Sequence, residues 1–130
     1  MENEKLKEII EQLKYGSNGL IPAIIQDVEN GEVLMFAFMN QASLEQTLAT
    51  GFATYWSRSR QKFWVKGESS GHTQKVKNIY YDCDKDCLLV KIEQNIAACH
   101  KGYRSCFFTE ITENGPKIID EKVFDEKEVY

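Results

Sequence analysis

The chain has 130 residues, of which 42% are hydrophobic, so it can close one core and we expect a single folded domain over residues 1–130. The 20 acidic and 16 basic residues are mixed along the chain and give a net charge of −4, which argues against extended nucleic acid as a partner. No stretch reaches the roughly 18 consecutive apolar residues of a membrane span, and the charged first residues do not resemble a secretion signal. We therefore expect a cytoplasmic protein with no membrane partner.

The N-terminal segment predicts an amphipathic helix. Its apolar residues recur at intervals of three and four between Lys and Glu, and they are Leu6, Ile9, Ile10 and Leu13. This helix should end near Gly16. Residues 41–50 predict a second, short helix, because Gly51 follows at the position of a C-cap.

Strands dominate the rest of the chain. Two β-rich runs, residues 20–27 and 33–39, flank Asn30-Gly31 and predict a hairpin. Further strand-like runs are separated by loops rich in Gly, Ser and Asn, and they contain Tyr55-Trp56, Phe63 to Val65, Val76 to Tyr81, Leu88 to Ile92, and Phe107 to Ile111. We expect an α+β fold in which β-strands dominate, with a charged C-terminal segment after Gly115 that ends in a short exposed strand.

The densest chemical signal is the segment Asp82-Cys83-Asp84-Lys85-Asp86-Cys87. In an extended chain its carboxylates would point to one side and Cys83 to the other, which suits a hard cation on one side and a soft metal on the other. The outer carboxylates would then lie roughly 13 Å apart, so all three can share one ion only if the segment bends. A solvated acidic loop is the competing interpretation.

An EF-hand calcium loop is a sharper rival for the same segment. Counted from Asp82, its twelfth position is Glu93, as that pattern requires. The sixth position, normally Gly, is Cys87, and both flanks are strand-like instead of helical. The EF-hand therefore ranks well below the other interpretations.

Three cysteines with a nearby histidine suggest zinc. Cys99 and Cys106 surround His100, and Cys83 lies upstream. Their spacing is not the paired C-x-x-C of a structural finger, and a site with three protein ligands leaves the fourth position for water, as catalytic zinc does. The alternative is that these are buried, inert cysteines. Cys87 is expected to have no role.

A basic, aromatic segment from Trp56 to His72 suggests a site for a phosphorylated purine. Arg58, Arg60, Lys62 and Lys66 alternate with hydroxyl and aromatic residues, which suits small phosphates and a base stacked on a ring. An exposed strand with a basic face is the plainer alternative. His72 and His100 are the only histidines, and either can move a proton or bind a metal.

Together these segments resemble the phosphoribosyl-AMP cyclohydrolase family. The resemblance runs from about Val33 to Phe108, with Lys101 and Tyr103 as departures from the usual pattern. The blocks that carry it are Trp56-Ser57-Arg58-Ser59-Arg60, Lys66-Gly67-Glu68-Ser69-Ser70-Gly71-His72, Asp82-Cys83-Asp84-Lys85-Asp86, Val90-Lys91-Ile92-Glu93-Gln94, Ala98-Cys99-His100, and Arg104-Ser105-Cys106-Phe107.

The resemblance implies hydrolysis of the N1–C6 bond of the adenine in phosphoribosyl-AMP, a step of histidine biosynthesis. It implies an intertwined homodimer with active sites between the subunits. It also assigns Cys83, Cys99 and Cys106 to zinc, and Asp82, Asp84 and Asp86 to magnesium. From the residues themselves we predict that His72 and His100 are catalytic, either one being able to act as the general base, and that the substrate is bound by Trp56, Arg58, Arg60, Lys66, Glu68 and Arg104.

Two other functions are weighed against this one. A zinc-binding or calcium-binding module without catalysis would enclose its metal fully in protein ligands. A zinc nucleobase deaminase would carry H-x-E and P-C-x-x-C signatures, which are absent from the sequence.

Overall fold

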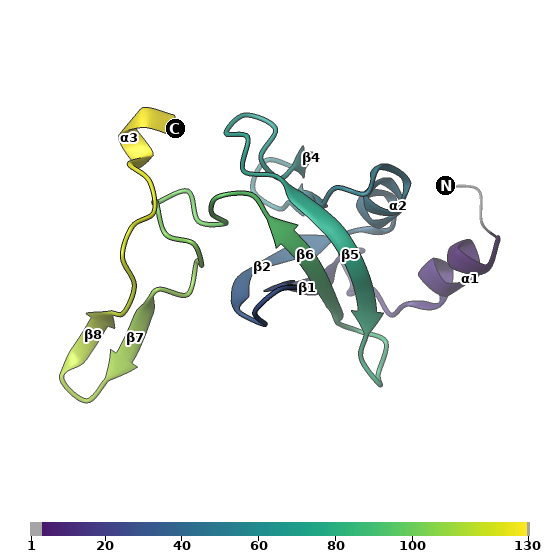
Figure 1. Cartoon of the computed structure of the whole chain (residues 1–130). Coiled ribbons are helices and arrows are strands. Elements are labelled where there is room, and N and C mark those ends of the chain that lie inside the picture. The colour runs from purple at the N-terminus through teal and green to yellow at the C-terminus, as the bar shows by residue number, and fades with distance from the viewer. Residues whose placement is uncertain (1–3, 130) are drawn as a thin grey trace.

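The computed structural model describes residues 4–129, with side chains described up to residue 127, and has an α+β fold in which strands dominate, as expected (Figure 1). The predicted helices at residues 4–12 and 41–50 are both present. None of the helices in this part of the chain is long and apolar enough to cross a membrane. In chain order the elements are α1 (Glu4–Gln12), β1 (Ile21–Asp27), β2 (Val33–Met39), α2 (Gln41–Thr50), β3 (Thr54–Ser57), β4 (Lys62–Val65), β5 (Gln74–Tyr81), β6 (Leu88–Gln94), β7 (Thr109–Thr112), β8 (Gly115–Ile118) and α3 (Glu126–Val129).

The central element is a four-stranded sheet in the order β2-β1-β6-β5. The predicted hairpin is confirmed: β1 and β2 pair antiparallel, with Ile21 opposite Met39, and Gly31 takes a positive φ of 77° in the connection. β6 pairs parallel to β1 and antiparallel to β5. The short β3–β4 hairpin lies beside this sheet, linked to it through α2.

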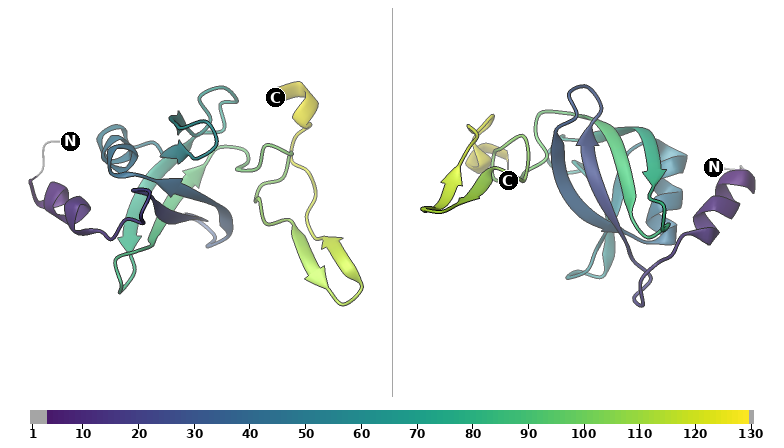
Figure 2. Two further views of the ribbon diagram at one scale, coloured as in Figure 1. Left: turned by 180° about the vertical axis from the view of Figure 1, so that it is seen from behind. Right: turned by 90° about the horizontal axis from the view of Figure 1, so that it is seen from below.

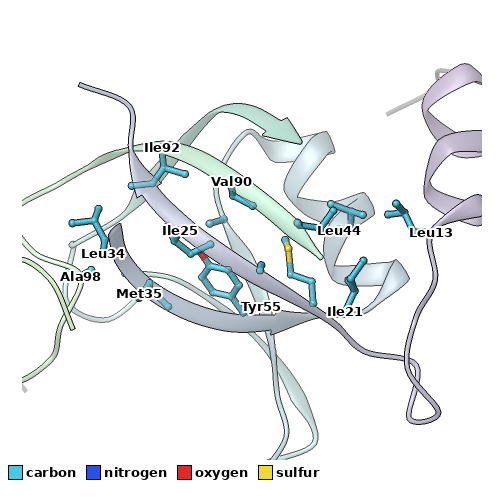
Figure 3. Packing of buried hydrophobic residues seen from close by; sticks show 14 of the residues in the cluster. Leu13, Ile21, Ile25, Leu34, Met35, Leu44, Tyr55, Val90, Ile92 and Ala98 are labelled. Carbon is cyan, nitrogen blue, oxygen red and sulfur yellow. The ribbon is translucent and has the colours of Figure 1, made fainter. Parts of the chain in front are cut away.

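The core lies between the sheet and α2 (Figure 3). β1 and β6 bury alternate residues, as the two-residue period of a strand requires. Leu44 of α2 and Tyr55 of β3 close the cluster. A fully buried Ile such as Ile25 contributes about 1.5–3 kcal/mol to folding.

The helix α2 begins at a complete capping box. Asn40 accepts a hydrogen bond from the Ser43 backbone N–H, and the Ser43 hydroxyl accepts one from the Asn40 N–H. The helix ends at Gly51, whose φ of 83° makes it the left-handed cap that the sequence predicted.

The sequence left open whether the acidic segment is extended or bent, and it bends: β5 ends at Tyr81 and residues 82–87 form the turn to β6. Two sequence expectations need correction. Phe107 and Phe108 precede β7, which begins only at Thr109. The C-terminal segment carries its strand, β8, at its start and the single helical turn α3 at its end.

The hairpin β7–β8 and α3 stand apart from the rest of the molecule in every view (Figure 1, Figure 2). We refer to residues 107–123 as the arm. Ile111 on the arm is 95% exposed, and Phe107, Ile118, Ile119 and Val123 are exposed as well. The arm has no hydrophobic core of its own.

Candidate active site

The β3–β4 hairpin forms one wall of a groove of about 360 Å³. Trp56 of β3 pairs with Phe63 of β4, and their rings meet edge to face. Arg58 lies in the turn with its guanidinium 4.2 Å from the centre of the Phe38 ring, outside the groove lining. The groove is lined by Arg60, Lys62, Trp64, Val65, Lys66, Gly67, Glu68, Ser69, Ser70 and His100. Four residues predicted for substrate or catalysis thus meet here: Arg60, Lys66, Glu68 and His100.

Lys66 is the buried link between this groove and the cysteines. Its ammonium donates a 2.5 Å hydrogen bond to the carbonyl of Ala98, the residue before Cys99. Burial lowers the pKa of Lys66, while the negative charges of Cys106 and Cys99 act in the opposite direction. Lys66 was predicted to hold a phosphate, and its closest described contact is instead with the cysteine segment.

Cys99 and Cys106 lie beside each other. The Cys99 N–H bonds to the Tyr103 carbonyl, and the Cys106 N–H bonds to the Leu34 carbonyl on β2. Cys106 is exposed as a residue, yet the protein around its thiol partly desolvates it. That desolvation, the charge of Cys99 and a hydrogen bond with it raise the pKa of Cys106 to about 11, against the opposing effect of Lys66.

Arg104 holds the cysteine segment to the sheet. Its guanidinium donates to the carbonyls of Gln94 and Ile96 and forms a 2.8 Å ion pair with Asp27 at the end of β1. Burial alone would raise the pKa of Asp27, but the hydrogen bonds from Arg104 and from the Glu29 backbone, with the charge of Arg104, lower it overall. Arg104 was predicted to contact the substrate, but its guanidinium is already bonded to groups of the protein.

The two histidines lie in different surroundings. His100 is exposed and lines the groove. His72 is only 2% exposed and packs edge to face against Phe124, 4.7 Å between ring centres. Burial and the nearby charge of Lys66 lower the pKa of His72, which favours its neutral form.

Gly67 positions the His72 segment. Its φ is 82°, and a Cβ there would lie 2.4 Å from the carbonyl carbon of His72. Gly102 likewise packs against the backbone of Phe124, whose segment returns from the arm. Glycine is required at both places because the chains approach too closely for any side chain.

The acidic turn brings Asp82, Asp84 and Asp86 together. One oxygen of each lies within 4.8 Å of the others, because Lys85 takes a positive φ of 61° and folds the segment back. This is the bend that the straight-strand estimate required. Its flanks are β5 and β6, so the EF-hand arrangement of two helices is excluded.

The acidic turn also places two cysteines. Cys83 is exposed on it, and Cys87 is partly buried at its base. Burial and the charges of Asp82 and Asp86 raise the pKa of Cys87. Among residues 4–127, the aspartates are the only cluster of three potential metal ligands, so Cys83 does not join Cys99 and Cys106 within one chain.

Two buried amides were not predicted from the sequence. Gln74 and Gln94 are buried at the N-terminal end of β5 and the C-terminal end of β6, and they hydrogen-bond each other. The signal was present, since Gln94 continues the inward-facing series Leu88, Val90 and Ile92. A polar residue at such a position needs an internal partner.

Comparison with known proteins decides the family. The model of the family "Phosphoribosyl-AMP cyclohydrolase" matches residues 35–108, which is more than half of the chain. This chain belongs to the phosphoribosyl-AMP cyclohydrolase family. The match covers the groove, the acidic turn and the cysteine segment.

Individual relatives agree with this placement. The chain is 57% identical over 121 residues to the phosphoribosyl-AMP cyclohydrolase of Methanococcoides burtonii, covering 93% of this chain and 98% of that protein. It is 54% identical to the enzyme of Pelotomaculum thermopropionicum over 122 residues, 93% and 95% of the two chains. It also matches the histidine biosynthesis bifunctional protein HisIE of Thermoanaerobacter pseudethanolicus at 50% identity, covering 96% of this chain and 58% of that protein. The expected family and enzyme class, a hydrolase of histidine biosynthesis, are confirmed.

Proposed function

We propose that this protein hydrolyses the N1–C6 bond of the adenine ring in phosphoribosyl-AMP and releases the formimino-carboxamide ribotide, the third step of histidine biosynthesis. One observation carries the proposal: a single groove gathers Arg60, Lys66, Glu68 and His100, and Lys66 connects it to Cys99 and Cys106. A basic groove beside paired thiols combines phosphate binding with a soft metal site. The reaction needs both.

The groove's charges suit the substrate. Arg60 and Lys62 line the groove, and the exposed Arg58 lies in the adjoining turn, so guanidinium and ammonium groups are available to two phosphates. Trp64 lines the groove and provides aromatic surface for the base, while Trp56 lies on the neighbouring strand β3 outside the lining. Glu68 adds an acceptor for ribose hydroxyls or the purine amino group.

Zinc suits the cysteine pair. Two adjacent thiols are soft ligands, and the ammonium of Lys66 beside them offsets negative charge when they ionise. Cys83, the third predicted ligand, would come from the acidic turn of a second subunit, since it does not meet the pair within one chain. When bound, zinc supplies a Lewis acid that activates water for attack at neutral pH.

Magnesium suits the acidic turn. Desolvation raises the pKa of Asp86, and so do its hydrogen bond with Asp82 and the charges of Asp82 and Asp84. Mutual repulsion of this kind is relieved by a divalent cation with oxygen ligands. We assign this cation to substrate binding.

His100 and His72 divide the handling of protons. C6 of an N1-ribosylated adenine is an electron-poor amidine carbon, so addition of water there requires a proton to leave the water and another to reach a ring nitrogen. The exposed His100 in the groove is placed to exchange protons with the substrate. We assign a supporting role to His72, which is buried and whose lowered pKa favours the neutral form that can accept a proton.

A homodimer completes the site. A two-stranded hairpin is marginally stable alone, and the arm leaves Ile111, Ile118 and Phe107 exposed. Burial of these residues against a second copy of the chain would stabilise the arm. The same association would bring the acidic turn of one subunit to the cysteine pair of the other.

The four free thiols suit a reducing compartment, and we place the reaction in the cytoplasm. The deciding experiment is to incubate purified protein with phosphoribosyl-AMP, with and without zinc and magnesium, and to follow the ultraviolet change on ring opening. We expect turnover that is lost on chelation and restored by zinc with magnesium. Stoichiometric zinc binding without turnover would instead support a non-catalytic metal-binding module.

A matched pair of variants tests the ligand assignment. We expect Cys99→Ser to lose zinc and activity, while Cys87→Ser keeps both, because Cys99 lies beside Cys106 whereas Cys87 is partly buried at the base of the acidic turn. Metal analysis of the two purified proteins measures this. Equal zinc loss in both variants would refute the assignment.

A further inference from the structure

A chain of three buried polar side chains runs through the protein toward the candidate site. The Tyr55 hydroxyl donates to Oε1 of Gln74 over 2.5 Å, and Nε2 of Gln74 donates to Oε1 of Gln94 over 2.7 Å. Tyr55 and Gln74 are fully buried, and Gln94 is 8% exposed. Buried polar groups in such a chain are held in place, because losing one partner leaves the next unsatisfied.

This hydrogen-bonded series of side chains ends at backbone carbonyls of two segments. Nε2 of Gln94 lies 3.1 Å from the Ala97 carbonyl oxygen, 3.2 Å from that of Asn95, 3.3 Å from that of His72 and 3.5 Å from that of Thr73. One pair of carbonyls belongs to the His72 segment. The other pair leads directly into Ala98 and Cys99.

The backbone carbonyls at one end of this series determine which group donates in each of its hydrogen bonds. Carbonyl oxygens only accept, so Gln94 must turn its NH₂ toward them and its oxygen toward Gln74. Gln74 must then donate to Gln94, which leaves its own oxygen to accept from the Tyr55 hydroxyl. Each amide therefore has one permitted orientation.

The contact between the His72 segment and the Cys99 segment is closely packed on its other sides as well. Gly67 packs against the His72 backbone with no room for a Cβ, and Lys66 bonds the Ala98 carbonyl. Arg104 donates to the Gln94 and Ile96 carbonyls. Asn95 also joins the two segments, through its backbone N–H to the Thr73 carbonyl and its side-chain amide to the Gly71 carbonyl, while the single amide nitrogen of Gln94 reaches carbonyls of both.

We propose that Gln94, whose amide oxygen is held by Gln74 and through it by Tyr55, is a positioning residue that sets the placement of the Cys99 segment relative to the His72 segment. The inference rests on the proposed function, in which Cys99 holds zinc and His72 supports catalysis. Gln94 acts through these segments and touches neither substrate nor metal. Groups that orient metal ligands from behind commonly change metal affinity by about 10–100-fold when removed.

The test is the nearly isosteric variant Gln94→Glu, whose carboxylate cannot donate to the four carbonyls. On folded protein we expect zinc affinity, measured by competition with a chromophoric chelator, to fall roughly 10–100-fold. We expect kcat to fall while KM changes far less, because the substrate-binding groove is left in place. The matched control is Glu93→Gln on the exposed face of the same strand, which should leave zinc affinity and kcat unchanged.

A purely structural role predicts a different result. It would lower the melting temperature and the folded fraction, with normal zinc affinity in the protein that folds. A folded Gln94→Glu protein with wild-type zinc affinity and wild-type kcat overturns the proposal.

Gln74→Met is the second variant, because it keeps the Gln94 amide but removes the donor that holds its oxygen. It should give a smaller loss of zinc affinity in the same direction, and it decides the matter if Gln94→Glu does not fold. An unchanged zinc affinity in folded Gln74→Met then overturns the proposal. A wild-type protein that binds zinc but opens no ring contradicts the proposed function, and the zinc affinities still decide the role of Gln94.

Discussion

At the scale of single residues, the ion pair between Asp27 and Arg104 joins the sheet to the cysteine segment. Asp27 is buried and its carboxylate also accepts the Glu29 N–H, while Arg104 continues to two carbonyls beyond β6. Breaking one side of a buried charged contact leaves the other charge unsatisfied. Folding stability and the placement of the cysteines should therefore depend on the same pair.

We predict that Asp27→Asn lowers the free energy of unfolding by about 2 kcal/mol at pH 7. The folded-state pKa of Asp27 is lower than its unfolded value of about 3.9, so its stabilisation is present above that value and is lost as pH falls through the folded pKa. The difference between variant and wild type should shrink from pH 7 to pH 3 in urea unfolding. Glu93→Gln, which removes the exposed ion pair with Lys77, is the control and should cost less than about 1 kcal/mol. A difference that does not change with pH would contradict this assignment.

At the scale of elements, the turn between β5 and β6 converts an acidic strip into a cluster. The Lys85 N–H bonds the Asp82 carbonyl, and the Lys85 carbonyl accepts from the Lys14 backbone after α1. The turn is therefore held from both sides. The backbone of the turn, and not the hydrophobic core, brings the three carboxylates together.

The Asp84→Asn variant separates the two metals. We expect near-normal zinc by metal analysis, because the proposed zinc ligands are cysteines, together with reduced activity that needs far more magnesium for recovery. Measurement of activity against magnesium concentration checks this. Parallel loss of zinc and activity with an unaltered magnesium requirement would instead assign Asp84 to the zinc centre.

The loop after β4 offers a second element-scale test in two glycines. Gly67 and Gly71 have nearly the same φ, 82° and 81°, but an added Cβ meets the His72 backbone only at Gly67. Gly71→Ala should cost about 1–2 kcal/mol for the left-handed backbone alone. Gly67→Ala should cost a further ~1–3 kcal/mol for the clash, measured by urea unfolding. Equal losses would show that the close approach is relieved without cost.

At the scale of the whole molecule, the arm and the separated cysteines require the same explanation. The arm exposes apolar residues that one chain leaves uncovered, and Cys83 lies away from Cys99 and Cys106. The proposed symmetric dimer would cover the exposed arm and would bring Cys83 of one subunit to the cysteine pair of the other. In that proposal one chain alone does not complete the site.

Subunit complementation tests this arrangement. Cys83→Ser and Cys106→Ser should each be inactive, whereas refolding them together should restore about a quarter of wild-type activity, because hybrid dimers carry one intact site. Refolding Cys99→Ser with Cys106→Ser is the control and should restore nothing, since both ligands belong to the same half of a site. A monomeric mass in solution, or recovery in the control, would contradict the dimer.

Local sequence was sufficient to predict the helices, the β1–β2 hairpin and the strand-rich fold, because capping residues, alternation and turn glycines act over a few positions. The short sequence motifs were sufficient to predict the family. The short-range motif also located the acidic cluster, although only the turn at Lys85 decided that its carboxylates converge. Tertiary structure decided what depends on distant segments. It pairs Arg104 with Asp27, Lys66 with the Ala98 carbonyl and Gln94 with the His72 carbonyl, residues that are 22 to 77 positions apart. Such pairings follow from how the sheet packs its strands, and no periodicity in the sequence specifies them.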